Sequence, residues 1–433
     1  REKCYFRATV AGMGMASAMD SEERGGPLSV LRDGELWFRE RIPTDVPWGD
    51  ESFLEPVPTD AVGCFGLKVA TDSEIDGQRY RTGEIVVVDS LVDLRRLLER
   101  FPAVSELILP WYGRLIPGVW IEPHRETVDL VSYRTQFAGR FVRSLLLTTG
   151  IIAVGFAFSE LRMLALLFAT VYGLSPLVES GLAWMRRVDR YSVDELNRRL
   201  VNFELFRRWI LQKRSPLLRV GLFCLVAIFA GQMWVGIEPS IEAAALLKSE
   251  VFSGGEWWRT VTTGLMHGSL LHILFNGMAL YSLGRVIVAL VSPPLLSFVF
   301  LVTVVAGSLA SLYLGPAVAS VGASGGILGC LGFLLVLTFK FRTVLPGFLQ
   351  ANLIQSTLVV AIFGALGAGF IDNAAHAGGL VGGVLLGLLA WPWIRLAPVT
   401  VKPGVRLLSL ASLTVLGAGL GKIAWELWKL APL

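Results

Sequence analysis

Residues 322–340 read Gly-Ala-Ser-Gly-Gly-Ile-Leu-Gly-Cys-Leu-Gly-Phe-Leu-Leu-Val-Leu-Thr-Phe-Lys, a glycine-rich turn that leads into an apolar run. Asp, Glu, Lys and Arg are absent from residues 286–339, 343–371 and 373–394. The hydrocarbon core of a bilayer is about 30 Å thick, and a helix needs about 20 apolar residues to cross it. The sequence therefore predicts an all-α polytopic membrane protein.

Further apolar runs complete this prediction. Six spans form a core over residues 216–396, and one extra C-terminal helix follows at 405–425. Residues 144–178 are apolar except for Glu160 and Arg162. One straight helix of that length would measure about 52 Å, so we expect a transmembrane hairpin of two short helices that turns near Glu160. The six core spans are expected at about 217–237, 268–288, 294–314, 323–340, 351–371 and 376–395.

The charges of the connecting segments predict the orientation. Residues 186–219 hold ten basic and four acidic residues, and the connections with Lys340 and Lys402 are also basic. Basic connections mark the cytoplasmic side, which the N-terminal part then shares. We expect the inner membrane of a bacterium. Within residues 180–215, apolar side chains recur at helical intervals, which favours a basic amphipathic linker on the inner leaflet over a solvated connector; they are Leu196, Leu200, Phe203, Phe206 and Ile210.

The first third of the chain differs in composition. The whole chain is 53% hydrophobic and 17% charged, yet residues 1–143 hold 41 charged residues with a net charge of −5. We expect a poorly ordered lead over 1–26 and a soluble cytoplasmic α+β domain over 27–140. Its strands are predicted at 63–70, 84–89 and 106–109, and its helix at 90–101. An acidic domain is not suited to nucleic acid. Whether it binds a cytoplasmic partner or only stabilises or targets the protein stays open.

Cysteine usage and the N-terminus exclude other classes. Cys224 and Cys330 lie inside apolar runs, so neither a disulfide framework nor a zinc site is expected. No basic segment followed by an apolar one opens the chain, and we expect no signal peptide in these residues. No motif for a cofactor or a metal is present.

Polar groups within spans are costly and need a reason. Ser324 opens the fourth core span, His376 opens the sixth, and His272 and Asn276 lie near the start of the second, with His267 just before them. A serine hydroxyl becomes a nucleophile when a neutral histidine takes its proton. A glycine-rich turn into a helix exposes that hydroxyl and directs backbone N–H groups at a developing oxyanion. His272 and Asn276, four residues apart, share one helix face and can donate to the same oxyanion.

Each motif also has a structural interpretation. The Gly-Ala-Ser-Gly-Gly segment and the pair Gly379 and Gly383 are by default helix-packing surfaces. His272 and Asn276 could be an interhelical hydrogen-bonded pair. The combination, in this order and at similar membrane depth, favours chemistry.

Together these segments resemble the rhomboid intramembrane serine proteases over about residues 216–396. The resemblance rests on Trp258-Arg259, His267-Gly-Ser-Leu-Leu-His272-Ile-Leu-Phe-Asn276, Gly322-Ala-Ser324-Gly and His376-Ala-Gly-Gly379-Leu-Val-Gly-Gly383. It implies a Ser–His dyad with Ser324 as nucleophile and His376 as general base, and cleavage of transmembrane proteins near the outer membrane boundary. It also implies the supporting roles: His272, Asn276 and the Ser324 N–H as oxyanion donors, His267 as a structural residue, Trp258 and Arg259 as a motif of the first outer loop, and Gly379 and Gly383 at a close helix contact.

Two positions depart from the family pattern. A tyrosine common one turn after the nucleophile is replaced by Leu328, and a glutamate common in the second span by Val288. Asp372 lies one turn before His376; it could orient that histidine, but the helix dipole explains an acid there adequately.

Three alternatives to a protease stay open. A catalytically weak or inactive rhomboid-like binding or quality-control factor is the main one, although the chain keeps the serine, the histidine and the oxyanion pair. A proton-coupled transporter would need acidic residues at mid-depth, which the core spans lack. A metal site from His267, His272 and His376 lacks a carboxylate to complete it.

Overall fold

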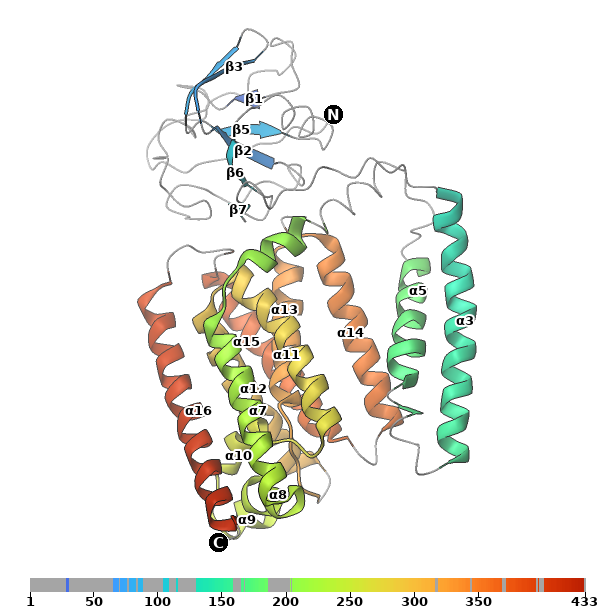
Figure 1. The fold of residues 1–433 in the computed structure, drawn as a ribbon, viewed down its shortest axis with the longest axis vertical. Helices are drawn as coiled ribbons and strands as arrows, with labels where there is room; N and C mark the ends of the chain where they lie inside the picture. The colour runs from blue at the N-terminus through green and yellow to red at the C-terminus, as the bar shows by residue number, and fades with distance from the viewer. Residues whose placement is uncertain are drawn as a thin grey trace.

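The computed structural model describes short segments between residues 29 and 115, then 130–158, 165–185 without 167, residue 203, 205–394 without 316–317, 343–344 and 368–370, residue 396, and 401–431. These residues contain seven helices that are long and apolar enough to cross a membrane. Figure 1 shows them as one bundle, with α16 at one edge and α3 at the other. The prediction of a mostly helical, multi-pass membrane protein is confirmed.

The core helices lie where the apolar runs predicted them, with ends that differ by no more than five residues. Their polar or proline-rich starts fix these ends: Ser215 caps α7 through the N–H of Leu218, and Ser269 caps α11 through the N–H of His272. The six helices are α7 (Pro216–Val235), α11 (Leu270–Leu290), α12 (Pro293–Leu314), α13 (Ser324–Lys340), α14 (Gly347–Leu366) and α15 (Asn373–Ala390).

Helix α13 is the shortest and most enclosed of the six. Its 17 residues give a length of about 26 Å, less than the hydrocarbon core. At its last residue the Lys340 ammonium lies 4.7 Å from the centre of the Trp391 ring. Helices α11, α12, α14 and α15 all contact α13, so it forms the centre of the core.

Glycines bring α13 and α15 into backbone contact. A Cβ atom on Gly379 would collide with the carbonyl of Gly325, and one on Gly383 would collide with the carbonyl of Gly329. On the α13 side, a Cβ on Gly332 would meet the carbonyl of Leu380. The small residues that sequence analysis assigned to helix packing therefore do pack two helices.

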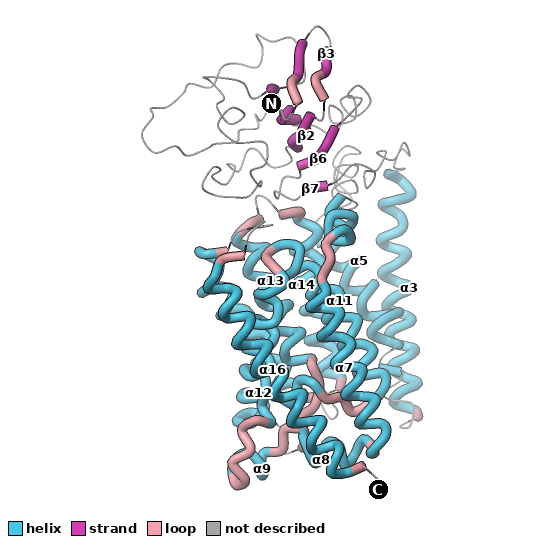
Figure 2. The backbone as a smooth tube through the Cα atoms, turned by 60° about the vertical axis from the view of Figure 1, so that its left-hand side comes forward, coloured by secondary structure: helices cyan, strands magenta, loops and turns pink. Residues whose placement is uncertain are grey.

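The connection from α7 to α11, residues 236–269, is built from short helical segments at one end of the bundle. It contains α8 (Ile237–Ala244), α9 (Lys248–Phe252), α10 (Arg259–Thr262) and the 3-10 turn η6 (Thr263–Leu265). We call this end of the bundle the site end. The C-terminal end of α16 (Pro403–Leu430) lies at the same end in Figures 1 and 2.

Helix α16 packs along α12 and α7. The hydroxyls of Ser297 and Ser409 hydrogen-bond at 3.0 Å in the buried contact with α12. Closer to the site end, Ile423 is fully buried, and Leu427 contacts Gly231 of α7 closely enough that a Cβ there would be 3.1 Å from it. The extra C-terminal helix is thus an integral part of the bundle.

The predicted hairpin pairs α3 (Leu130–Ala157) with the π-helical turn η4 (Ala169–Leu174) and α5 (Ser175–Met185). Gly173 approaches Thr148 so closely that a Cβ would collide with it, and the Gln355 amide of α14 donates to the Ser175 carbonyl at 3.2 Å. The first of the two helices is longer than the short helix expected, because α3 extends through the polar residues before its apolar part, Gly139–Ala157. The predicted turn at Glu160 lies outside the described residues.

The linker is described only at its end. Residues 205–212 are helical, and Leu205, Phe206 and Trp209 are buried in the core. Phe203 and Phe206 meet Phe348 of α14 edge to face, at 5.1 and 5.5 Å between ring centres. This part of the apolar face therefore packs on protein rather than on the inner leaflet. The remainder of the amphipathic prediction lies outside the described residues.

Among the described residues, seven short strands precede α3. Five of them form a sheet in the order β1-β5-β2-β6-β7, with antiparallel pairing throughout (Figure 1), and β3 and β4 form a separate hairpin. The helix expected at 90–101 lies outside the described residues, so the α+β assignment stays a prediction. The strands are β1 (Ser29–Val30), β2 (Phe65–Val69), β3 (Ser73–Ile75), β4 (Gln78–Tyr80), β5 (Ile85–Val88), β6 (Val104–Ile108) and β7 (Arg114–Leu115).

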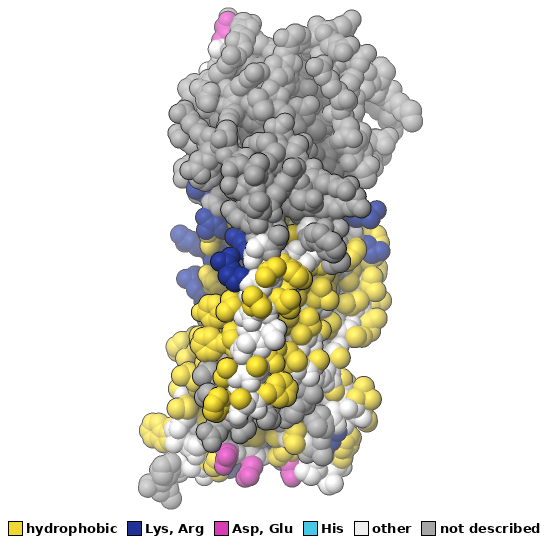
Figure 3. All heavy atoms as spheres, turned by 90° about the vertical axis from the view of Figure 1, so that its right-hand side faces the viewer, with side chains coloured by type: hydrophobic (Ala, Val, Ile, Leu, Met, Phe, Trp, Pro, Cys, Tyr) yellow, Lys and Arg dark blue, Asp and Glu magenta, His cyan; other side chains and the backbone are white. Residues whose placement is uncertain are grey.

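Charge is separated along the bundle axis. Figure 3 shows an apolar band with Lys and Arg gathered at the end nearer the strands and Asp and Glu at the site end. From residue 216 onward, every described acidic residue belongs to elements at the site end: Glu238, Glu242, Glu250, Glu256, Asp372 and Glu426. The apolar band between the two ends is the surface that the bilayer covers.

The glycine contact makes a stability prediction. Gly383→Ala should lower the free energy of unfolding by about 1–3 kcal/mol, because the added methyl group collides with the Gly329 backbone. Gly417→Ala is the matched control, since nothing lies within 4 Å of a Cβ at that exposed position of α16. Alanine favours a helix over glycine, so the control should be neutral or slightly stabilising. Thermal unfolding of both variants in detergent measures the difference, and equal effects would contradict the contact.

Candidate active site

Ser324 is the first residue of α13, and a sharp turn precedes it. Gly322 has a φ of +126°, a backbone conformation that favours glycine, and Ala323 is the N-cap. The first N–H groups of a helix have no acceptor within the helix. The turn therefore places the Ser324 hydroxyl beside unpaired backbone donors.

His376 lies in the first turn of α15 and reaches Ser324. Its Nε2 atom is 2.8 Å from the Ser324 Oγ atom, a hydrogen-bond distance. The two residues are 52 positions apart in the chain. The backbone contact between Gly325 and Gly379 brings the starts of the two helices together.

Asp372 caps α15 instead of orienting His376. One carboxylate oxygen accepts the N–H of Ala375 at 2.9 Å, and the other accepts the hydroxyl of Ser311 on α12. Both oxygens are thereby engaged away from the imidazole. The alternative of a third member of a triad is not supported, and the interpretation as a helix N-terminal acid agrees with the structure.

His272 and Asn276 of α11 face the turn before Ser324. A Cβ on Gly322 would lie 2.6 Å from the His272 ring and 3.4 Å from Asn276 Nδ2. Only glycine fits at position 322 of the turn before Ser324, because any larger side chain would collide with His272. Asn276 is 8% exposed, and its Nδ2 atom is buried with no hydrogen-bond partner among the described residues. A buried, unpaired amide donor is costly, which is typical of a group that serves a ligand.

His267 is fully buried just before α11. Its ring meets the His272 ring edge to face at 5.1 Å between centres. Burial, with a smaller effect of the nearby His272, lowers the pKa of His267 to about 3. The imidazole is therefore neutral at physiological pH. No cluster of three or more potential metal ligands occurs in the part of the chain that the structure describes.

Gln232 of α7 holds the His267 backbone from both sides. Its Oε1 atom accepts the His267 N–H at 3.0 Å, and its Nε2 atom donates to the His267 carbonyl at 3.1 Å. The same amide lies 3.1 Å from the Ser240 hydroxyl of α8. Sequence analysis missed Gln232; the one signal that could have found it is an uncharged amide inside an apolar span.

Arg259 ties the α7–α11 connection together. Although it is only 5% exposed, its guanidinium pairs with the Glu256 carboxylate at 2.6 Å. It also donates to the carbonyls of Glu242 and Ala245, at 3.0 and 2.7 Å. The centre of the neighbouring Trp258 ring lies 4.8 Å from the Arg259 guanidinium. Arg259 of the Trp-Arg motif thus links α10 to the end of α8 and to Glu256.

The connection is joined directly to the segment that leads into Ser324. Leu246 and Ser320 exchange two backbone hydrogen bonds, at 3.1 and 3.0 Å. Thr263 donates its hydroxyl to the Ser320 carbonyl at 2.6 Å, and its own carbonyl accepts the Gly322 N–H at 2.9 Å. These contacts, which were not predicted from the sequence, hold the turn before Ser324 in place.

The two departures from the family pattern are filled by the core. Leu328 and Val288 are both buried and belong to the main hydrophobic cluster. Apolar packing therefore occupies the places where other members carry polar or aromatic groups.

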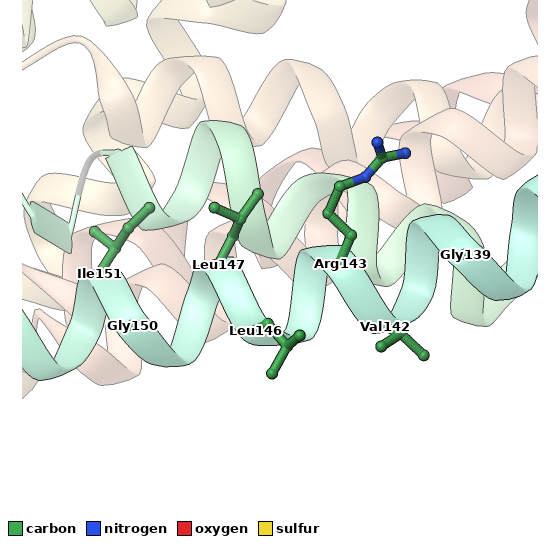
Figure 4. Close-up of a pocket in the computed structure, with 7 residues that line it drawn as sticks. All are labelled: Gly139, Val142, Arg143, Leu146, Leu147, Gly150 and Ile151. Atoms are coloured by element: carbon green, nitrogen blue, oxygen red, sulfur yellow. The ribbon is translucent and has the colours of Figure 1, made fainter.

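A groove elsewhere in the bundle has no part in this site. Figure 4 shows that it runs along a single face of α3, with Arg143 as its one charged side chain. It shares no residue with the cluster around Ser324. Its lining residues are Gly139, Val142, Arg143, Leu146, Leu147, Gly150 and Ile151.

Comparison with known proteins places this geometry in a family. The Rhomboid domain matches residues 254–393. Rhomboid protease GluP of Bacillus subtilis (strain 168) is 33% identical over 210 residues, which are 47% of this chain and 38% of that protein. The rhomboid-named YdcA of the same bacterium is 30% identical over 138 residues, which are 32% of this chain and 69% of YdcA.

RHOMBOID-like protein 5 of Arabidopsis thaliana is 29% identical over 175 residues, 38% of this chain and 55% of the relative. The chain thus spans less than two thirds of two of these three relatives. The Rhomboid match contains Trp258, Arg259, His267, His272, Asn276, Ser324 and His376, whereas Gln232, Ser240, Glu242, Ala245 and Leu246 precede it. On these grounds the chain belongs to the rhomboid family.

Proposed function

We propose that this protein is an intramembrane serine protease that cleaves transmembrane proteins near the outer boundary of the membrane that it spans. The observation that carries the proposal is the hydrogen bond between His376 Nε2 and Ser324 Oγ, beside the unpaired amide of Asn276. Relatives named as proteases, at about 30% identity, support a peptidase activity.

The geometry suits acyl transfer in two stages. His376 takes the Ser324 proton as Oγ attacks the scissile carbonyl carbon, and it returns that proton to the leaving amine. In the second stage His376 takes a proton from the water that attacks the acyl carbon, and it passes that proton to the Ser324 Oγ as the bond between the acyl carbon and Oγ breaks. Asn276, His272 and the Ser324 N–H donate to the oxyanion that forms in each stage. A helical substrate must unwind locally, because the carbonyls of a helix are hydrogen-bonded internally.

Two groups of charged residues support the proposed orientation. Most described Lys and Arg residues of the bundle lie at the end nearer the strands, with Lys248, Arg259, Lys422 and Lys429 at the site end. From residue 216 onward, all described acidic residues lie at the site end. By the positive-inside rule, the N-terminal strands are cytoplasmic and the site opens to the other face. The two relatives from Bacillus subtilis support the cell membrane of a bacterium as the location. A cytoplasmic partner or substrate tail for the N-terminal part stays a prediction.

The orientation is tested with single cysteines in a background without the native ones. Arg81→Cys and Ser253→Cys both occupy exposed positions, the first directly after the β3–β4 hairpin and the second directly after α9. Figure 1 shows β3 and α9 at opposite ends of the molecule. In intact cells an impermeant maleimide should label Ser253→Cys and spare Arg81→Cys. After the membrane is permeabilised, both should react. Labelling of Arg81→Cys in intact cells would contradict the hairpin topology.

The dyad is tested by cleavage and by active-site labelling. Purified protein should cut single-pass test substrates that carry helix-breaking residues, and Ser324→Ala and His376→Ala should each reduce turnover to background without a change in melting temperature. A fluorophosphonate probe should label the wild type and the control Ser356→Ala, a serine on the exposed face of α14. It should label neither dyad variant.

Two results would contradict the proposal. Equal labelling with and without His376 would exclude the dyad. If the wild type neither cuts a substrate nor reacts with the probe, while an authentic rhomboid protease does both under the same conditions, the protein is an inactive rhomboid-like binding factor.

The oxyanion donors make a separate prediction. Asn276→Ala should lower kcat by roughly 10²–10³-fold, the usual effect of losing one oxyanion donor, with a small change in KM. Asn352→Ala, at an exposed position in the first turns of α14, is the matched control and should leave both constants unchanged. A loss in Asn276→Ala confined to KM would assign the amide to substrate binding instead.

A further inference from the structure

Helix α16 adds to the six core helices, and its C-terminal part reaches the site end of the bundle. There it contacts α10 and η6 in the α7–α11 connection. At the buried Gly419, a Cβ would lie 3.3 Å from Val261 and 3.5 Å from Leu265. The glycine therefore lets α16 approach the connection to van der Waals distance.

One turn further on, Lys422 contacts the Trp258 ring. Its ammonium lies 4.6 Å from the ring centre, within the range of a cation–π interaction. It is paired with Glu426 at 2.6 Å, as Arg259 is with Glu256 at the same ring. Two cations from different segments thus share one indole, and each is paired with a carboxylate. The two carboxylates offset the repulsion between the two cations.

A single short helix, α10, connects Trp258 to the turn before Ser324. Trp258 is the N-cap of α10, and Thr263 follows the helix directly. Thr263 is the residue that accepts the Gly322 N–H and donates to the Ser320 carbonyl. The Ser308 hydroxyl of α12 holds the same helix by donating to the Thr260 carbonyl at 2.8 Å. Trp258, α10, Thr263 and the turn before Ser324 thus form one continuous series of contacts.

We propose that Lys422 of α16 is a positioning residue, which holds Trp258 and, through Thr263, keeps the turn at Gly322 in the geometry that Ser324 needs. This rests on the proposed protease function. It assigns the C-terminal helix a role in the reaction rate, in addition to its contribution to the packing of the bundle.

The matched control is Lys429, on the same helix. Its ammonium also pairs with Glu426, at 3.0 Å, but it lies over Trp425 and not over Trp258. Lys422→Met should lower kcat and the rate of fluorophosphonate labelling about three- to tenfold, the range expected for one partly desolvated cation–π contact. KM should change little. Lys429→Met should match the wild type, and Lys422→Arg, which keeps a cation at the ring, should recover most of the rate.

A second measurement does not depend on catalysis. Hydrogen exchange should become faster in the peptide that holds the Ser320 and Gly322 amides in Lys422→Met, and should be unchanged in Lys429→Met. If Lys422→Met does not accumulate in the membrane, Gly419→Leu replaces it, since a larger side chain there separates α16 from Val261 and Leu265. The same slower labelling and faster exchange are expected.

The proposal is overturned if Lys422→Met labels at the wild-type rate with unchanged exchange, or if Lys429→Met has the same effect as Lys422→Met. It is also overturned if the Lys422→Met and Thr263→Val effects on the labelling rate simply multiply, because two residues on one path should couple in a double-mutant cycle. A wild type that does not react with the probe would refute the protease function alone. Amide exchange would then decide the positioning role.

Discussion

The backbone contact between α13 and α15 is the constraint on which the site depends. Gly325 and Gly379 let the two helices touch. Ser324 is the first residue of α13, and His376 lies in the first turn of α15, so the contact brings their side chains together. A methyl group at Gly379 or Gly383 would separate the helices by more than the hydrogen bond between the dyad side chains can tolerate. Without a hydrophobic driving force between helices in lipid, such close packing is also a main source of association. Stability and reactivity therefore rest on the same glycines.

The α7–α11 connection provides the second half of the site. It consists of short helical segments joined by turns, and its polar groups connect them: Arg259 binds two carbonyls and Glu256, Thr263 binds Ser320, and Gln232 of α7 binds the His267 backbone. Backbone without helical hydrogen bonds is tolerated at membrane depth only when protein satisfies it. The connection thus fixes the turn before Ser324 relative to the start of α11.

Much of the bundle could be predicted from the sequence because the bilayer imposes a simple rule on span length. The residues now seen around Ser324 could also be identified, since histidine is rare in apolar helices and the order of these residues matches a family. Gln232 and Thr263 could not be identified, because they bind the backbone of residues distant in the sequence. The sequence alone does not distinguish an uncharged polar side chain that makes such contacts from one that does not. Lys422 resembles an ordinary boundary lysine until its contact with Trp258 is seen. The start of α3 was misplaced because a helix can continue into polar residues beyond the membrane.

The short length of α13 has a consequence for the depth of cleavage. If Lys340 and Trp391 mark one hydrocarbon boundary, the Ser324 end of a helix about 26 Å long stops a few ångströms inside the other. For the proposed protease, hydrophobic mismatch would then set the position of the scissile bond relative to the lipid: a thicker bilayer would bury it further, and a thinner one would bring it to the headgroups. The same protein would in this way meet different peptide bonds of one substrate in membranes of different thickness.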